Sequence, residues 1–216
     1  MSNATERAYL YVRQQILSGH FPAGSHLKEE HIAEEANVSR TPVREALRRL
    51  ATEHMVKFVT NQGAFVISWD DEDVESIFEI RVLLEGYSAY RAATRIDDEE
   101  ISEMETCADE IEKLCESHNN ENHRKTIEFN HRLHSIIVEA SGSEHLRRLL
   151  ASLVEVPMLL KTIDRYSDED VERSNHHHRE IIQAFRARDA EWARNIMEAH
   201  LRSAHRIYVS GDDAPA

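Results

Sequence analysis

The chain has 216 residues, a formal net charge of −14 and two cysteines. This length allows two domains, and no segment approaches the roughly 18 consecutive apolar residues that a membrane-spanning helix needs. The amino terminus lacks the basic and then apolar pattern of a secretion signal, so we expect a cytoplasmic protein without a membrane partner.

The first part of the chain begins with two short helical patterns separated by a turn. The first pattern covers Arg7–Leu17 and ends near Gly19, with turn residues following over 21–24. Its apolar residues are Ala8, Leu10, Val12, Ile16 and Leu17. A second short helix is predicted over Lys28–Ala36, after which Asn37 suits a left-handed backbone position.

The stretch Val38–Leu50 predicts a third helix with two different faces. Ser39 or Thr41 can cap its start, and Pro42 is tolerated in a first turn. The apolar face holds Val43, Leu47 and Leu50, and a neighbouring arginine stripe holds Arg40, Arg44 and Arg48. Arginine can bind phosphate or read the O6 and N7 acceptors of guanine. The pattern indicates a DNA recognition helix, the alternative being a solvated face of an ordinary helix.

Two β-branched and aromatic runs, Val56–Thr60 and Ala64–Ile67, follow that helix. The residues Asn61-Gln62-Gly63 between them suit a hairpin turn, which predicts a winged helix-turn-helix. Arg7–Val66 resembles the DNA-binding domain of the GntR family of bacterial transcription regulators. The resemblance implies that the third helix enters the major groove and that the wing tip reaches the minor groove.

This resemblance implies a set of DNA contacts, to which we add the last arginine of the stripe. The set implied by the family is Ser39, Arg40, Thr41 and Arg44 on the third helix, with Gln62 and Gly63 at the wing tip. Arg48 is added because it continues the stripe. The family often has a basic or polar phosphate contact where this chain has Glu29-Glu30, which would repel phosphate, so no contact is expected there.

Charge is divided unevenly between the two parts of the chain. Residues 1–69 hold eight Lys and Arg against seven Asp and Glu, a balance of +1, whereas the rest holds 18 against 33, or −15. A monomer with so few phosphate contacts would bind DNA poorly at physiological salt. We therefore expect a homodimer that places two DNA-binding domains on an inverted repeat in double-stranded operator DNA.

The acidic group in Trp69–Asp73 suits the start of a helix and of a second domain, residues 70–216. Six helical stretches are predicted there, at about 71–95, 98–117, 121–140, 144–165, 168–187 and 190–210, with Pro157 kinking the fourth. Cys107 and Cys115 would lie roughly 12 Å apart along one helix, too far for a disulfide. The predicted fold class is mostly α: a winged helix-turn-helix with a small β-hairpin wing over residues 1–69, then an all-α antiparallel helical bundle.

Three of the 14 histidines share helical faces with apolar residues. They are His134, His178 and His200, and Asn130 lies one turn before the first of them. Each alone is most simply a hydrogen-bonded core imidazole. Together they leave several nitrogens without partners, which one divalent cation would satisfy. His176 and His177 are rotated away from the face of His178, and we expect His131, His145 and His205 on the surface.

The second part of the chain resembles the effector-binding domain of the FadR branch of GntR regulators, known as the FCD domain. The resemblance implies a metal held by Asp or Asn, by a histidine four residues later, and by two histidines on later helices. This pattern falls on Asn130, His134, His178 and His200. Asn130 replaces an aspartate of many relatives and is a weaker, neutral donor, which lowers the expected metal affinity. Zinc is favoured, and nickel or another first-row metal also fits.

Arg81 is the candidate anion clamp for a small organic acid effector. It stands in a run that resembles the Arg-x-x-x-Glu of the first FCD helix, and the alternative is a surface pair with Glu85. The family resemblance then implies a homodimeric transcriptional repressor, not an enzyme. In it residues 70–216 bind the effector at the metal and provide dimerisation, and effector binding relieves repression.

Two alternatives stay open at this point. The metal can be purely structural, tying helices of the same DNA-binding protein together. Less favoured is a metal-dependent hydrolase with a metal-activated water. The sequence places no carboxylate in an obvious general-base position near the histidines, and a hydrolase would have no use for the DNA-binding domain.

Overall fold

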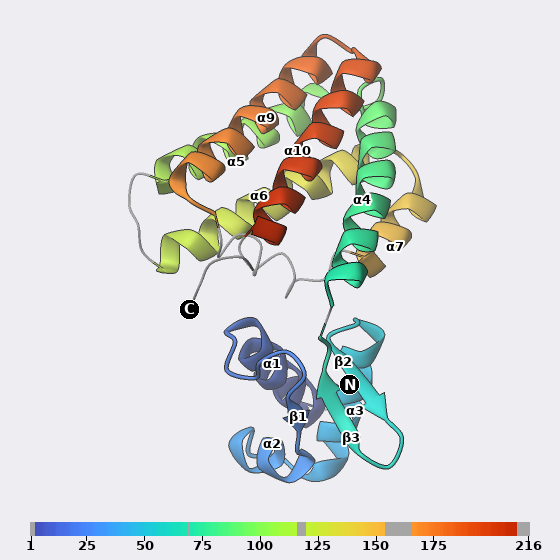
Figure 1. The fold of residues 1–216 in the computed structure, drawn as a ribbon, viewed down its shortest axis with the longest axis vertical. Coiled ribbons are helices and arrows are strands. Elements are labelled where there is room, and N and C mark those ends of the chain that lie inside the picture. Colours follow the sequence, from blue (N-terminus) through green and yellow to red (C-terminus); the bar gives the residue numbers. More distant parts are fainter. Residues whose placement is uncertain (1–2, 69, 116–119, 154–165, 211–216) are drawn as a thin grey trace. The chain divides into compact units, whose positions relative to one another are not determined.

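The computed structural model describes residues 3–68, 70–115, 120–153 and 166–210, drawn as ribbon in Figure 1. The described chain divides into two compact units, and the second begins at Asp71. Each unit has its own hydrophobic core. The mostly helical fold class predicted from the sequence is confirmed, including the winged helix-turn-helix and the helical second part.

The first unit consists of three helices and a small antiparallel sheet. In chain order its elements are α1 (Asn3–Leu17), β1 (His26–Leu27), α2 (Glu29–Glu35), α3 (Arg40–Thr52), β2 (Val56–Val59) and β3 (Gly63–Val66). The strand order is β1-β3-β2, with Phe58 opposite Ala64 in the hairpin. β1 was not predicted from the sequence, because a two-residue strand is too short to show an alternating pattern.

Backbone geometry and burial explain how this unit presents α3. Asn37 has φ 50°, the left-handed conformation expected between α2 and α3, and Asn61 turns the hairpin with φ 62°. The apolar face of α3 is fully buried, whereas Leu10 of α1, grouped with the apolar residues of its helix, is 54% exposed. Ala8 and Val12 are four residues apart and share one face of the helix. Leu10 is two residues from each of them and therefore lies on another side. One face of α3 is thus fixed by the core, and the opposite face is available to a partner.

The second unit is a bundle of helices. The described helices are α4 (Asp71–Ala92), α5 (Asp98–Cys115), α6 (Asn120–Ala140), α7 (Glu144–Leu153), α9 (Asp168–Arg186) and α10 (Ala190–Ser210). α10 packs between α4 and α9, and α5 packs against α6 and α9 (Figure 1). The predicted fourth stretch is described only to Leu153, and the predicted kink at Pro157 and the boundary residue Trp69 lie outside the described residues.

Close packing of α4 against α10 fixes the helix that carries Arg81. Gly86 lies where these helices approach, and a Cβ atom there would come 2.8 Å from Cγ of Glu198. The hydrophobic core of this unit includes Leu133 and Ile137 of α6 and Ile181 and Phe185 of α9.

Both cysteines are free thiols. Within the described ranges, no helix combines the length and apolar character needed to cross a membrane.

Candidate metal centre and DNA-reading surface

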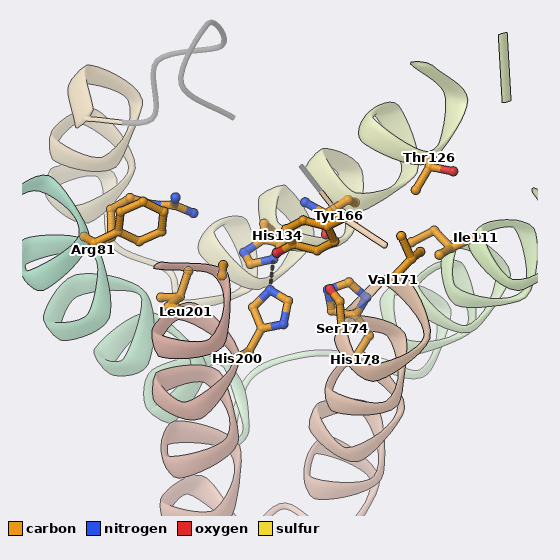
Figure 2. A pocket seen from close by; sticks show the side chains of 13 residues that line it. Arg81, Ile111, Thr126, His134, Tyr166, Val171, Ser174, His178, His200 and Leu201 are labelled. Carbon is orange, nitrogen blue, oxygen red and sulfur yellow. Dashed lines mark hydrogen bonds between the residues drawn. The ribbon is translucent and has the colours of Figure 1, made fainter. Parts of the chain in front are cut away.

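Three imidazoles from three helices converge in the second unit. His134 lies on α6, His178 on α9 and His200 on α10, and one ligand nitrogen from each lies within 4.8 Å of the other two. Nε2 of His134 is 3.2 Å from Nε2 of His200, the contact dashed in Figure 2. The structure therefore brings together the three histidines that the sequence analysis selected.

The buried nitrogens of this cluster lack partners. His178 is 1% exposed and His200 is 5% exposed. Both ring nitrogens of His178 and Nδ1 of His200 have no hydrogen-bond partner among the described residues. A buried polar atom without a partner costs about 1–3 kcal/mol. A divalent cation would take up such lone pairs, so these residues fit the metal implied by the resemblance.

Burial also sets the protonation state of the cluster. Loss of solvation lowers the pKa of His178 and of His200 well below the ordinary value, and the neighbouring imidazoles lower it further. Both rings are therefore neutral at pH 7, which is the form in which histidine binds metals.

Asn130 lines the same pocket from one turn before His134 on α6. Its side chain is partly buried, and an amide oxygen at this position can add a neutral ligand to the three imidazoles. The four predicted ligands thus border one cavity of about 40 Å³.

A buried ion pair lies directly beside the cluster. Nε of Arg81 donates to Oε1 of Glu85 at 2.7 Å, and Nδ1 of His134 lies 2.7 Å from Oε2 of the same carboxylate. Arg81 is 4% exposed and Glu85 is 3% exposed. The alternative of a surface Arg81–Glu85 pair is therefore wrong: the pair forms at the expected spacing, but it is buried because α4 turns this face toward α6 and α10.

The charge of Glu85 follows from these contacts. Burial alone would raise its pKa, but the Arg81 guanidinium and the hydrogen bond from His134 outweigh that effect and lower it to about 2. The ionised carboxylate accepts the Nδ1–H of His134, which leaves the lone pair on Nε2 facing the other imidazoles.

Glu85 is a neighbour of the cluster that was not predicted from the sequence. The sequence placed no carboxylate in an obvious general-base position near the histidines, and in the structure Glu85 contacts one of them. The sequence does mark Glu85, because it is the acidic end of the Arg-x-x-x-Glu motif. Its contact with His134 depends on the packing of α4 against α6. Both oxygens of Glu85 are occupied by Arg81 and His134, so it orients these two side chains.

The pocket extends beyond the histidines in two directions. Figure 2 shows Arg81, Tyr166 and Leu201 around the cluster. Arg81, Asn130 and His134 also border a wider pocket of about 320 Å³ between α4, α6 and α7. Burial raises the pKa of Tyr166 to about 12, so its hydroxyl stays protonated. Tyr166 was not predicted as a site residue, because it precedes α9 and belongs to no periodic pattern.

Five other histidines of the second unit differ in their exposure. His131, His145 and His176 are exposed, whereas His177 is partly buried with its ring edge-on to His200 at 5.9 Å. The expectation that His205 lies on the surface is wrong. It is partly buried and stacks on Phe78 of α4 at 4.9 Å, because the close approach of α4 and α10 covers this turn.

The predicted DNA contacts lie on the exposed side of the first unit. α3 begins at Arg40, after Ser39 in the N-cap position, although the Ser39 side chain makes no capping hydrogen bond. The exposed predicted contacts are Ser39, Arg40, Thr41, Arg44 and Arg48 on α3, with Gln62 and Gly63 at the wing tip. The opposite face of α3 is buried, so the helix shows the two faces that the pattern predicted.

Two acidic residues at the start of α2 contact the arginine stripe. Nη1 of Arg40 is 2.8 Å from Oε1 of Glu30, and Nε of Arg44 is 2.7 Å from Oε2 of Glu29. The sequence indicated that Glu29-Glu30 would repel phosphate, but it did not predict their ion pairs with α3. These pairs form because the turn between the two helices brings the start of α2 close to the arginines of α3. Part of the positive charge of the stripe is therefore already balanced within the protein.

Both parts of the chain match known domain families. Residues 4–66 match the bacterial regulatory proteins of the gntR family, and residues 76–203 match the FCD domain. The chain is 30% identical over 173 residues to the Nta operon transcriptional regulator of Aminobacter aminovorans, covering 80% of each protein. It is 28% identical over 189 residues to the gluconate operon transcriptional repressor of Bacillus subtilis, covering 82% of this chain and 74% of that protein. Escherichia coli McbR/YncC has a similar fold, with a TM-score of 0.80 at 20% identity, covering 99% of this chain and 100% of that one.

Proposed function

Since the chain belongs to the GntR family of bacterial regulatory proteins and carries an FCD domain, we propose that it is a repressor released from DNA by a small organic acid. Membership of this family makes the protein a transcription regulator and not an enzyme. Repression is the mode named for several similar regulators, including those of the gluconate and galactonate operons.

A divalent metal completes the effector site in this proposal. Asn130, His134, His178 and His200 would hold it, and an imidazole-rich set suits zinc, with nickel or another first-row metal also compatible. When bound, the metal supplies Lewis-acidic positions for a carboxylate oxygen. The observation that carries the proposal is the group of buried imidazole nitrogens without partners beside a buried arginine.

Arg81 provides the complementary cation for the effector. Its Nε is held by Glu85, and its position between the histidine cavity and the wider pocket suits a carboxylate that enters from the pocket. Burial strengthens such a charge-assisted contact relative to one at the surface. The preferred ligand is therefore a small acid with one carboxylate at the metal centre and Arg81.

A carboxylate titration tests this site. In zinc-loaded protein, acetate, gluconate and citrate are added in turn, and the midpoint of thermal unfolding is measured. We expect at least one acid to raise the midpoint of the wild type, because a ligand that binds the folded state stabilises it.

The response should disappear in Arg81→Gln, which removes the cation. The matched control is Arg147→Gln, which removes an exposed arginine at the margin of the wider pocket and should leave the response in place. A response to the acids that survives Arg81→Gln would contradict the role given to Arg81.

DNA recognition in the proposal uses the exposed face of α3 and the wing tip. The residues are those predicted from the sequence: Ser39, Arg40, Thr41, Arg44, Arg48, Gln62 and Gly63. A homodimer would place two such surfaces on an inverted repeat, which doubles the contacts available to a protein with few phosphate-binding cations.

An exposed apolar stripe on α4 supports the homodimer. Leu83 is 63% exposed and Tyr87 is 45% exposed, with Ile80 and Tyr90 continuing the same face at 40% and 38%. These residues recur at helical spacing, and contiguous exposed apolar surface marks interaction sites. A second copy of α4 in a twofold arrangement would cover this stripe with the same residues.

A further inference from the structure

Glu29, the first residue of α2, contacts Arg44 through one edge of the guanidinium group. Nε of Arg44 lies 2.8 Å from Oε1 and 2.7 Å from Oε2 of Glu29. The Glu29 side chain is 25% exposed, whereas that of Arg44 is 54% exposed. The carboxylate is thus the less exposed partner, and the arginine is the one that reaches further into solvent.

This contact leaves the other edge of Arg44 available. A guanidinium group has one N–H on Nε and two on each Nη. Among the described residues, no hydrogen bond or ion pair involves either Nη of Arg44. These two groups together can donate to O6 and N7 of one guanine, the commonest base-specific contact of arginine.

Arg40 is in a different state on the same helix face. Nη1 of Arg40 is bound to Glu30, and its Nη2 is 3.5 Å from Oε2 of Glu29. The edge that would meet a base or phosphate is therefore occupied by carboxylates, so Arg40 has to exchange partners on binding DNA. Glu30 thus contacts the Nη edge of Arg40, whereas Glu29 contacts Nε of Arg44 and, at longer range, Nη2 of Arg40.

We propose that Glu29 is a positioning residue that sets the sequence specificity of Arg44. It holds the Nε edge, directs the Nη edge outward and makes no contact with DNA itself. The inference rests on the proposed role of Arg44 in reading a base. It adds that discrimination between operator and other DNA depends on a carboxylate of α2.

Two physical effects make the specificity ratio sensitive to Glu29. Ordering a flexible side chain in an interface lowers affinity by about 2- to 12-fold, and a side chain already held in the free protein avoids most of that loss. The negative charge of Glu29 also repels phosphate on any duplex. The same carboxylate therefore favours the correct base by ordering Arg44. It also lowers the affinity for every duplex by repelling phosphate.

The test compares two duplexes with the full-length protein. One duplex is selected by the wild type from a randomised library, and the other has the same base composition in scrambled order. Dissociation constants are measured by fluorescence anisotropy at one salt concentration. We expect Glu29→Gln to lower the ratio of selected to scrambled affinity by about tenfold, with weaker binding to the selected duplex.

Glu30→Gln is the matched control, because it removes the same charge from the same end of α2. Glu30 pairs with Arg40 and not with Arg44. It should tighten binding to both duplexes by similar factors and keep the ratio. Glu29→Asp keeps the charge but shortens the side chain, so it should lower the ratio of selected to scrambled affinity as Glu29→Gln does. A ratio that stays at the wild-type value in both Glu29 variants would overturn the proposal.

A double-mutant cycle separates positioning from a general charge effect. In the Arg44→Ala background, Glu29→Gln should cause no further loss of the ratio, and a further loss would overturn the positioning role. If Arg44→Ala leaves binding to the selected duplex unchanged, the base-reading role of Arg44 and this inference both fail. If Arg44→Ala lowers the ratio and Glu29→Gln does not, only this inference fails.

Discussion

Among single residues, Glu85 contacts the histidine cluster without being one of the candidate metal ligands. Glu85 accepts from Nδ1 of His134 and thereby fixes which nitrogen of that ring faces the other histidines. It also neutralises the buried Arg81. One carboxylate therefore links the candidate metal ligands to the candidate anion clamp.

We expect Glu85→Gln to weaken metal binding by about 10- to 100-fold, because partners that orient a ligand histidine have effects of this size. It should also lower thermal stability, since removal of the carboxylate leaves the Arg81 charge buried without a counter-ion. Zinc affinity is measured by competition with a chromophoric chelator. Glu79→Gln, at an exposed position on the same helix, should keep the wild-type affinity, and equal affinities in both variants would argue against the orienting role.

At the scale of secondary-structure elements, α6, α9 and α10 each contribute one imidazole to the cluster. This arrangement suits a sensor, and it equally suits a structural metal that ties three helices together. Removing the metal distinguishes the two. A metal-stripped protein that keeps its helical circular dichroism but loses its response to carboxylates supports the sensor, whereas unfolding on removal supports the structural role.

The metal-stripped protein should become less stable as pH falls from 7.5 to 5.5. Burial lowers the pKa of His178 and of His200 in the folded state, while in the unfolded chain each titrates near its ordinary value of 6.5. Below that value the unfolded state binds more protons, so acid favours unfolding by up to ~1.4 kcal/mol per pH unit for each imidazole. Glu85, ionised in the fold down to a pKa of about 2, contributes only below 4.5.

The pH effect is read from the thermal midpoint in the presence of a chelator. His178→Leu should have a shallower pH dependence, because one of the two buried imidazoles is absent. A wild-type midpoint that does not change between pH 7.5 and 5.5 would show that these rings can take up protons without leaving the fold.

At the scale of the whole molecule, function in the proposal requires two copies. The stripe of Ile80, Leu83, Tyr87 and Tyr90 is the apolar surface of α4 that the described chain leaves exposed. We expect Leu83→Glu to convert the dimer to a monomer, because two facing carboxylates would be buried at a twofold interface. The molar mass is measured by light scattering on a sizing column.

The matched control for the dimer is Leu149→Glu, which changes an exposed leucine of similar accessibility on α7. It should leave the molar mass at the wild-type value. The monomeric Leu83→Glu protein should retain its metal but bind a palindromic duplex much more weakly, since it offers one recognition helix instead of two. A dimeric Leu83→Glu protein would place the interface elsewhere.

Most of the helices could be predicted from the amino-acid sequence, because most of them carry a periodic apolar pattern of their own. Val43 and Leu47 marked the buried face of α3 and Arg44 the exposed one, and the predicted histidines lay on the faces that became buried. The two-residue strand β1 carries no such pattern, and it forms only because β3 is there to pair with it.

Which polar groups meet depends on how elements far apart in the sequence pack against one another. Glu85 reaches His134 over 49 residues of chain, Glu29 reaches Arg44 over 15, and Tyr166 enters the pocket from outside any helix. A pattern within one helix specifies which face is buried, since that depends on its own residues. It does not specify the neighbour on that face, because the neighbour is chosen by the packing of the other helices.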